Sequence, residues 1–117
     1  MIQFRTEFSD NILFLYLEGD LIVEDIGLDL LDQVNDAIND KKLGCAIDIS
    51  NVRYMNSSGI GLLITILSKY RNKGGEICLV NPGTHVQKLL GITKLDTIFN
   101  IVENKTEALI KLKSILA

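Results

Sequence analysis

The feature of this chain that most constrains its fold is a repeated change in the spacing of its apolar residues. Two apolar runs of strand type come first, and four segments with apolar residues every three or four positions then alternate with three further apolar runs. The wider spacing is typical of a helix face, whereas short runs rich in β-branched and aromatic residues are typical of strands. The resulting order, ββαβαβαβα, predicts an α/β fold with a mixed, mostly parallel sheet packed with helices.

Turn residues between these segments set the expected boundaries. Residues 9–11, Ser-Asp-Asn, have turn chemistry, so we expect the first two strands to form a hairpin. We expect residues 50–57 to be a connection and residues 1–117 to form one domain. The expected strands span residues 2–8, 12–17, 45–49, 76–80 and 97–102, and the expected helices span residues 24–40, 59–70, 84–90 and 106–116.

Composition limits the classes of function. Of the 117 residues, 47% are hydrophobic, which is enough for a substantial core. The net charge is −3, and no cluster of Lys and Arg forms a basic stripe. We therefore expect no nucleic-acid partner. A protein or a small ligand as partner agrees better with this charge distribution.

Signals for export, membrane insertion and metal binding are not found in the sequence. The N-terminal segment lacks the pattern of a signal peptide, and no run of about 18 apolar residues predicts a membrane span, so we expect a cytoplasmic protein. Cys45 and Cys78 lie within apolar runs, which indicates buried core residues rather than a disulfide or a metal pair. His85 is the only histidine, and a single histidine is too little for a metal site.

The junction YMNSSGIG, residues 54–61, stands between an apolar strand and an apolar helix. In parallel α/β sheets the loops after the carboxyl ends of the strands form the usual functional edge. The first N–H groups of a helix lack partners within it, so Asn56 and the two serines that follow are all candidates to cap this helix. Gly59 and Gly61 would let the helix approach the sheet closely.

An exposed serine at the same junction is also suited to carry a phosphate. The phosphate would meet N–H groups and the positive end of the helix dipole. Almost two added negative charges would change a docking surface without unfolding the helix, which is a regulatory switch. Capping and phosphorylation both remain open explanations at this point.

Motifs of the common enzyme classes are missing. The sequence contains no Gly-x-Ser-x-Gly, and His85 falls in a separate short helical segment, so we do not expect a triad with Ser57. Gly59-x-Gly61 lacks the third glycine of a dinucleotide fingerprint, and Gly-x-x-x-x-Gly-Lys does not occur. We expect no catalytic residues, no cofactor and a protein that is not an enzyme.

The order of elements and residues 48–63, DISNVRYMNSSGIGLL, resemble the STAS domain of the anti-sigma factor antagonists. The family motif is Asp-Ser-Ser/Thr-Gly-x-Gly after a strand and a hydrophobic approach. LEGDL at 17–21 matches the family's L-x-G-x-L, and KGGEI at 73–77 matches its Gly-Gly lead into the next strand. Residues 86–99 resemble its closing apolar pattern, so the resemblance covers essentially the whole chain.

The resemblance implies a function in partner switching. Members of the family bind an anti-sigma factor that is also a serine kinase, and this binding releases the sigma factor. Phosphorylation of the first serine of the motif opposes the binding, and a PP2C-type phosphatase reverses the modification. Carried over by position, Ser57 is the expected phosphoacceptor, at the start of the second helix.

The resemblance also implies residues around the acceptor. The expected supporting loop consists of Asn56, Ser58, Gly59 and Gly61. Apart from the resemblance, an exposed apolar cluster around Ser57 would fit a partner site, and the expected partner-docking candidates are Asp20, Ile22, Met55 and Ile60.

Two positions depart from the family pattern. Asn56 replaces the acidic residue before the acceptor, and Ile22 stands where the family often has an aspartate. Asparagine keeps the shape and the capping ability of the side chain but removes its charge. Both changes favour an alternative, in which the chain is an unphosphorylated STAS scaffold or a ligand-sensing module in a signalling or transport-linked complex.

Overall fold

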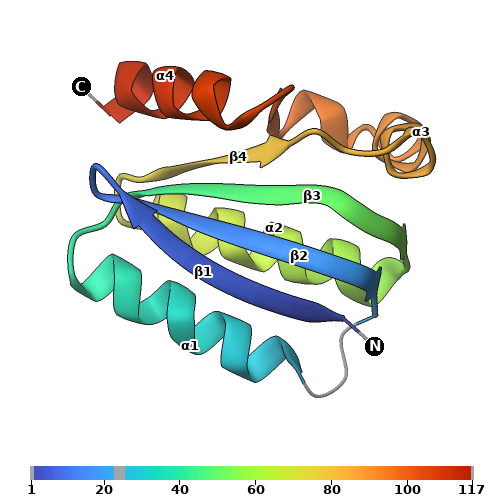
Figure 1. The fold of residues 1–117 in the computed structure, drawn as a ribbon, viewed down its shortest axis with the longest axis horizontal. Coiled ribbons are helices and arrows are strands. Elements are labelled where there is room, and N and C mark those ends of the chain that lie inside the picture. Colours follow the sequence, from blue (N-terminus) through green and yellow to red (C-terminus); the bar gives the residue numbers. More distant parts are fainter. Residues whose placement is uncertain (1, 23–25, 117) are drawn as a thin grey trace.

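The structure, a computed structural model, describes residues 2–22 and 26–116. Its strands form one sheet in the order β1-β2-β3-β4-β5, with helices on both faces (Figure 1). The strands are β1 (Gln3–Ser9), β2 (Ile12–Leu21), β3 (Gly44–Met55), β4 (Glu76–Val80) and β5 (Asn100–Val102). The helices are α1 (Ile26–Asn39), α2 (Ser57–Asn72), α3 (Thr84–Ile92), the short 3-10 helix η1 (Leu95–Thr97) and α4 (Lys105–Leu116). Within these described ranges, no helix is both long and apolar enough to cross a membrane.

The sheet begins with a tight hairpin. Asp10 and Asn11 both have positive φ, 52° and 67°, which is the conformation of the two central residues of a type I′ turn. The pair Ser9 and Ile12 closes the turn, and β1 is antiparallel to β2. β2, β3, β4 and β5 run parallel to one another, so their carboxyl ends lie at the same edge. The predicted ββαβαβαβα order, the hairpin and the mostly parallel sheet are confirmed.

The two faces of the sheet bury separate apolar cores. α1 and α2 cover one face, and α4 covers the other (Figure 1). Ile66 of α2 belongs to the first core and Leu112 of α4 to the second. Cys45 lies in the first core and Cys78 in the second, and both are buried free thiols. The cysteines are therefore core residues, as predicted.

β2 and β3 run further than the sequence predicts. β2 continues to Leu21 and β3 to Met55, so the expected connection over residues 50–57 is wrong for most of its length. The register between the two strands shifts twice, each time by one extra residue in β3, and such bulges break the alternation that marks a strand. At the first bulge Asp48 Oδ1 accepts hydrogen bonds from the N–H (2.9 Å) and the hydroxyl (2.6 Å) of Ser50.

The last strand is shorter than the sequence predicts. The sequence predicts a strand over residues 97–102, but β5 begins only at Asn100. The carbonyl of Leu95 accepts hydrogen bonds from the N–H groups of Ile98 and Phe99, both at 3.0 Å, which holds this segment in a turn. Among the helices, the expected start of α3 at residue 84 and the expected end of α4 at residue 116 are confirmed, and the other described ends differ from the expected ones by one or two residues. The expected start of the first helix, at residue 24, lies outside the described residues.

Candidate functional site

The junction between β3 and α2 lies at the edge of the sheet where the parallel strands end. Leu21 of β2 and Met55 of β3 are register partners at this edge, and α2 begins two residues later, at Ser57. Only Asn56 separates the strand from the helix. The junction therefore occupies the carboxyl edge, where functional residues of α/β proteins gather.

Asn56 is the N-cap of α2. Its backbone is extended (φ −108°, ψ −172°), and its Oδ1 accepts a hydrogen bond from the N–H of Gly59 at 3.1 Å. The same oxygen accepts from the Ser58 hydroxyl at 2.6 Å, and the Asn56 carbonyl accepts from the N–H of Ile60 at 3.0 Å. Of the three capping candidates in the sequence, the structure assigns the side-chain cap to Asn56.

Ser57 is the first residue of α2, and its side chain is exposed. The helix that carries it is held firmly, because its inner face contributes Leu62, Leu63, Ile66 and Leu67 to the core. The positive end of the helix dipole lies at this terminus and favours a negative charge. The Ser57 hydroxyl is thus accessible from solvent on a support that is itself rigid.

Ser58, Gly59 and Gly61 belong to the helix, which corrects the expectation that they form a supporting loop. Ser58 is exposed, and its hydroxyl donates to the cap residue. Gly61 is also exposed, and a Cβ added to it would meet nothing within 4 Å. Its carbonyl accepts a hydrogen bond from the Thr65 hydroxyl at 2.8 Å. Gly61 therefore plays no part in the contact between helix and sheet.

Gly59 is required by close packing between α2 and β2. A Cβ added to Gly59 would lie 2.2 Å from the carbonyl oxygen of Leu21 and 3.0 Å from its Cγ. The obstructing oxygen belongs to the backbone of a paired strand, so it cannot move aside easily. The expected close approach of the helix to the sheet is confirmed at Gly59 and wrong at Gly61.

The four docking candidates differ in exposure. Ile22 is exposed, and Asp20 and Ile60 are partly exposed at the same edge as Ser57. Met55 is only 2% exposed and belongs to the core between the sheet and helices α1 and α2. This burial corrects the expectation that Met55 faces a partner, because the last position of β3 points inward.

Two contacts that the sequence did not predict border the site. Tyr54, which is 45% exposed, stacks on His85 of α3 with ring centroids 6.1 Å apart. Arg53 Nη2 lies 3.4 Å from Asp20 Oδ1. Both pairs join different elements, and no local sequence signal marks them, because strand register and the position of α3 bring them together.

The chemistry that the site offers is that of exposed hydroxyl groups at a helix terminus. Within residues 2–22 and 26–116, no group of three or more His, Cys, Asp and Glu side chains is placed to hold a metal ion. His85 faces an aromatic ring rather than a serine hydroxyl. The arrangement therefore suits modification of a serine and contact with a partner.

Comparison with known sequences points to one family. The model of the STAS domain matches residues 3–108. Over 115 residues the chain is 29% identical to the anti-sigma F factor antagonist of Paenibacillus polymyxa, and the match covers 96% of each chain. A Thermotoga neapolitana protein, which is named as a candidate anti-sigma factor antagonist, is 36% identical to this chain over 61 residues. That match spans 52% of this chain and 54% of the relative, about half of each.

Solved structures share the fold. A Thermotoga maritima protein superposes with a TM-score of 0.84 at 24% identity over 94% of each chain. The Bacillus protein SpoIIAA has been solved without its phosphate (TM-score 0.72, 18% identity, 93% of this chain and 96% of that one). It has also been solved in the phosphorylated form (TM-score 0.74, 19% identity, 93% and 98%). At these identities the likeness establishes the fold alone.

Substitution of the two glycines tests the packing of α2. Gly59→Ala is expected to destabilise the protein by about 2 kcal/mol, because the new methyl group overlaps the Leu21 carbonyl. Gly61→Ala is the matched control and is expected to stabilise it by about 0.5–1 kcal/mol, since alanine favours the helix. Urea unfolding of both variants measures the difference. Equal midpoints for the two variants would contradict the close contact.

Substitution of Asn56 tests the cap. Asn56→Ala is expected to lower the free energy of unfolding by about 1 kcal/mol and to speed amide exchange at Gly59, because the accepting oxygen is lost. Asn56→Asp keeps the oxygen and adds a charge at the positive end of the dipole, so its stability is expected to match or exceed that of the natural chain. Thermal unfolding and hydrogen exchange measure both effects. An unchanged Gly59 exchange rate in Asn56→Ala would show that the side chain is not the cap.

Proposed function

Because the chain belongs to the STAS domain family, we propose that it is an anti-sigma factor antagonist. In this proposal it binds an anti-sigma factor and so releases the sigma factor that the anti-sigma factor otherwise holds. The anti-sigma factor is also a serine kinase, and phosphorylation of Ser57 opposes the binding. A PP2C-type phosphatase removes the phosphate. The protein acts in the cytoplasm by binding and is not itself an enzyme.

The exposed position of Ser57 at the first residue of α2 is the observation that carries this proposal. A kinase needs a hydroxyl that enters its active site without unfolding the substrate. Ser57 meets this need, because the buried face of α2 holds the helix while the serine stays outside. The neighbouring Ser58 is less suited, since its hydroxyl already donates to Asn56 at 2.6 Å.

The modification itself needs little from this chain. Ser57 Oγ forms a bond to the γ-phosphorus of ATP held by the kinase, the bond to the leaving ADP oxygen breaks, and the hydroxyl proton passes to a base of the kinase. The resulting phosphate carries up to about two negative charges next to the positive end of α2. The phosphorylated helix would therefore remain folded, and the change would be confined to the surface.

Apolar side chains around Ser57 support a docking role for the same edge. Ile22 and Tyr54 are exposed, and Ile60 is partly exposed. A partner that covers them would also exclude water from Ser57. A phosphate in that contact would have to lose its hydration. The free energy of this desolvation exceeds the stabilisation that the helix dipole provides. This desolvation explains why phosphorylation would oppose docking.

A binding module without phosphorylation is the second candidate, and Asn56 is the observation that favours it. Its side chain is a neutral amide whose oxygen forms the cap, and it brings no charge with which to orient the serine or meet a kinase. The docking edge would then serve as a permanent contact in a signalling or transport-linked complex. Mapping of the phosphate and the affinity of a Ser57→Asp variant for the partner distinguish the two candidates.

The first experiment locates the phosphate. Incubation with the cognate kinase and ATP is expected to place one phosphate on Ser57, as mapped by mass spectrometry. Ser57→Ala is expected to abolish incorporation, whereas Ser58→Ala, the matched control, is expected to retain it. Phosphate on another residue, or normal incorporation into Ser57→Ala, would remove Ser57 as acceptor. No incorporation into the natural chain would favour the second candidate.

The second experiment measures the effect of charge on docking. Ser57→Asp is expected to weaken binding to the anti-sigma factor at least about tenfold, because a buried unpaired charge opposes the contact. Ser114→Asp adds the same charge at an exposed position of α4 and is expected to leave the affinity unchanged. Isothermal titration calorimetry gives both affinities. Equal affinities for the two variants would argue against the switch.

A further inference from the structure

β5 ends the sheet on the side opposite β1 and pairs only with β4 among the strands described. The carbonyl of Val102 accepts a hydrogen bond from the N–H of Asn81 at 2.8 Å, so Val102 directs its backbone groups toward β4. Successive residues of a strand direct these groups to opposite sides. The N–H and C=O of Ile101 therefore point away from β4, where another strand can pair with them.

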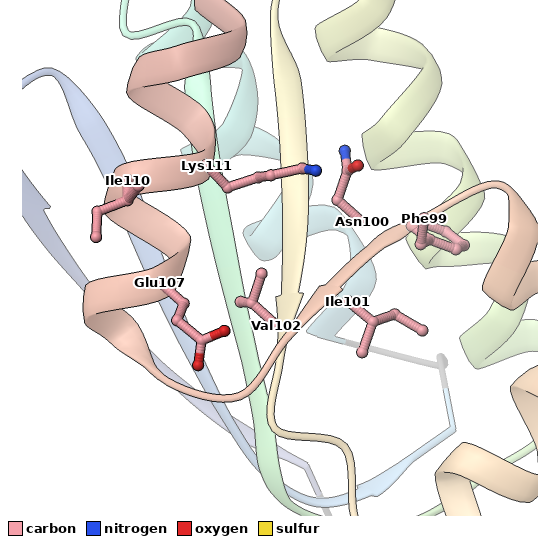
Figure 2. Close-up of a pocket in the computed structure, with 7 residues that line it drawn as sticks. All are labelled: Phe99, Asn100, Ile101, Val102, Glu107, Ile110 and Lys111. Atoms are coloured by element: carbon pink, nitrogen blue, oxygen red, sulfur yellow. The ribbon is translucent and has the colours of Figure 1, made fainter.

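A crevice of about 510 Å³ separates β5 from α4 beside this edge (Figure 2). Ile101 of β5 is 37% exposed and Ile110 of α4 is 65% exposed. Ile98, just before β5, is also exposed. Figure 2 shows Ile110 on the side of α4 that faces away from β5, so Ile98 and Ile101 supply the apolar surface at the edge itself. Apolar side chains exposed at a sheet edge indicate a contact surface for another protein.

The same crevice carries one acid and one base. Glu107 and Lys111 line it from α4, one helical turn apart, and Figure 2 shows both side chains extending from α4 toward β5. A surface with this arrangement is complementary to an antiparallel copy of itself, because a two-fold rotation places each charge opposite its counterpart.

We propose that the protein forms a two-fold symmetric dimer through β5, with a second copy of this chain as the partner. Ile101 and the partner's Ile101 pair in antiparallel fashion, so each N–H donates to the other carbonyl. The two sheets then continue as one. Lys111 pairs with Glu107 of the partner subunit, and Glu107 pairs with Lys111 of the partner subunit.

The spacing of strands is consistent with these ion pairs. Neighbouring strands lie about 4.8 Å apart, so the two β4 strands of the dimer are separated by about 14 Å. α4 packs mainly on β4, and the two α4 helices therefore face each other across the joined β5 strands. An extended lysine and an extended glutamate that point toward each other span a gap of this size.

The other edge of the sheet is less suited to pairing. β1 carries Arg5, whose guanidinium lies 3.9 Å from the Tyr16 ring centroid, and Glu7, which forms an ion pair with Lys105. Charges on an edge strand discourage pairing with another strand. The junction that carries Ser57 is also separate from the β5 edge, because it follows β3, and β3 and β5 are not neighbours in the sheet. Dimerisation through β5 thus leaves both copies of Ser57 open.

Charge exchange between two variants tests the dimer. Sedimentation velocity of the full chain from about 10 μM to about 1 mM is expected to show a monomer–dimer equilibrium, as suits a small interface. Glu107→Lys and Lys111→Glu are each expected to weaken self-association at least about tenfold, because like charges then meet. An equal mixture of the two variants is expected to restore the dimer. Recovery in the mixture alone identifies contacts between chains, which a changed helix stability cannot produce.

Ile101→Asp provides a second test and is expected to weaken the dimer by a similar factor, because the two new carboxylates would lie next to each other at the two-fold axis. Ile92→Asp changes a still more exposed isoleucine, 80% exposed on α3, and is expected to leave self-association unchanged. Far-ultraviolet circular dichroism checks that each variant is folded. A natural chain that stays monomeric over the whole concentration range overturns the proposal. A dimer that survives both charge variants, or a mixture that stays monomeric, also overturns it, and none of these results bears on Ser57.

Discussion

The backbone contact between the first turn of α2 and the end of β2 is the constraint on which the carboxyl edge depends. Gly59 lies so close to the Leu21 carbonyl that no side chain fits between them. Residues two apart in a helix point roughly 200° apart, so Ser57 must face away from the sheet when Gly59 faces it. The exposure of the serine is therefore a consequence of helix geometry and of a single close contact.

The same contact explains the short connection between strand and helix. Only Asn56 lies between β3 and α2, and it must both leave the strand and satisfy the start of the helix. An extended backbone and an accepting side chain meet both needs, which few residue types can do. The edge that carries Ser57 is thus rigid before any partner arrives, and partner binding there would lose little conformational entropy.

The order of elements and the opening hairpin could be predicted because local patterns determine them: apolar spacing, and a turn whose Asp10 and Asn11 tolerate positive φ. The bulges of β3 could not, since they depend on pairing with β2 and interrupt the local pattern. The role of a glycine in α2 also depends on its position along the helix, which the residue type alone does not reveal. Gly59 and Gly61 look equivalent in the motif, yet one contacts a strand and the other open space.

The ion pairs of α4 have a consequence for folding during synthesis. Lys113 and Lys105 reach back to Asp10 and Glu7 of the hairpin, across 103 and 98 residues. α4 follows all five strands, so it leaves the ribosome after them. The core under α1 and α2 can assemble on the nascent chain, whereas the opposite face of the sheet stays bare until α4 emerges. This late closure makes that face the surface on which chaperones would act.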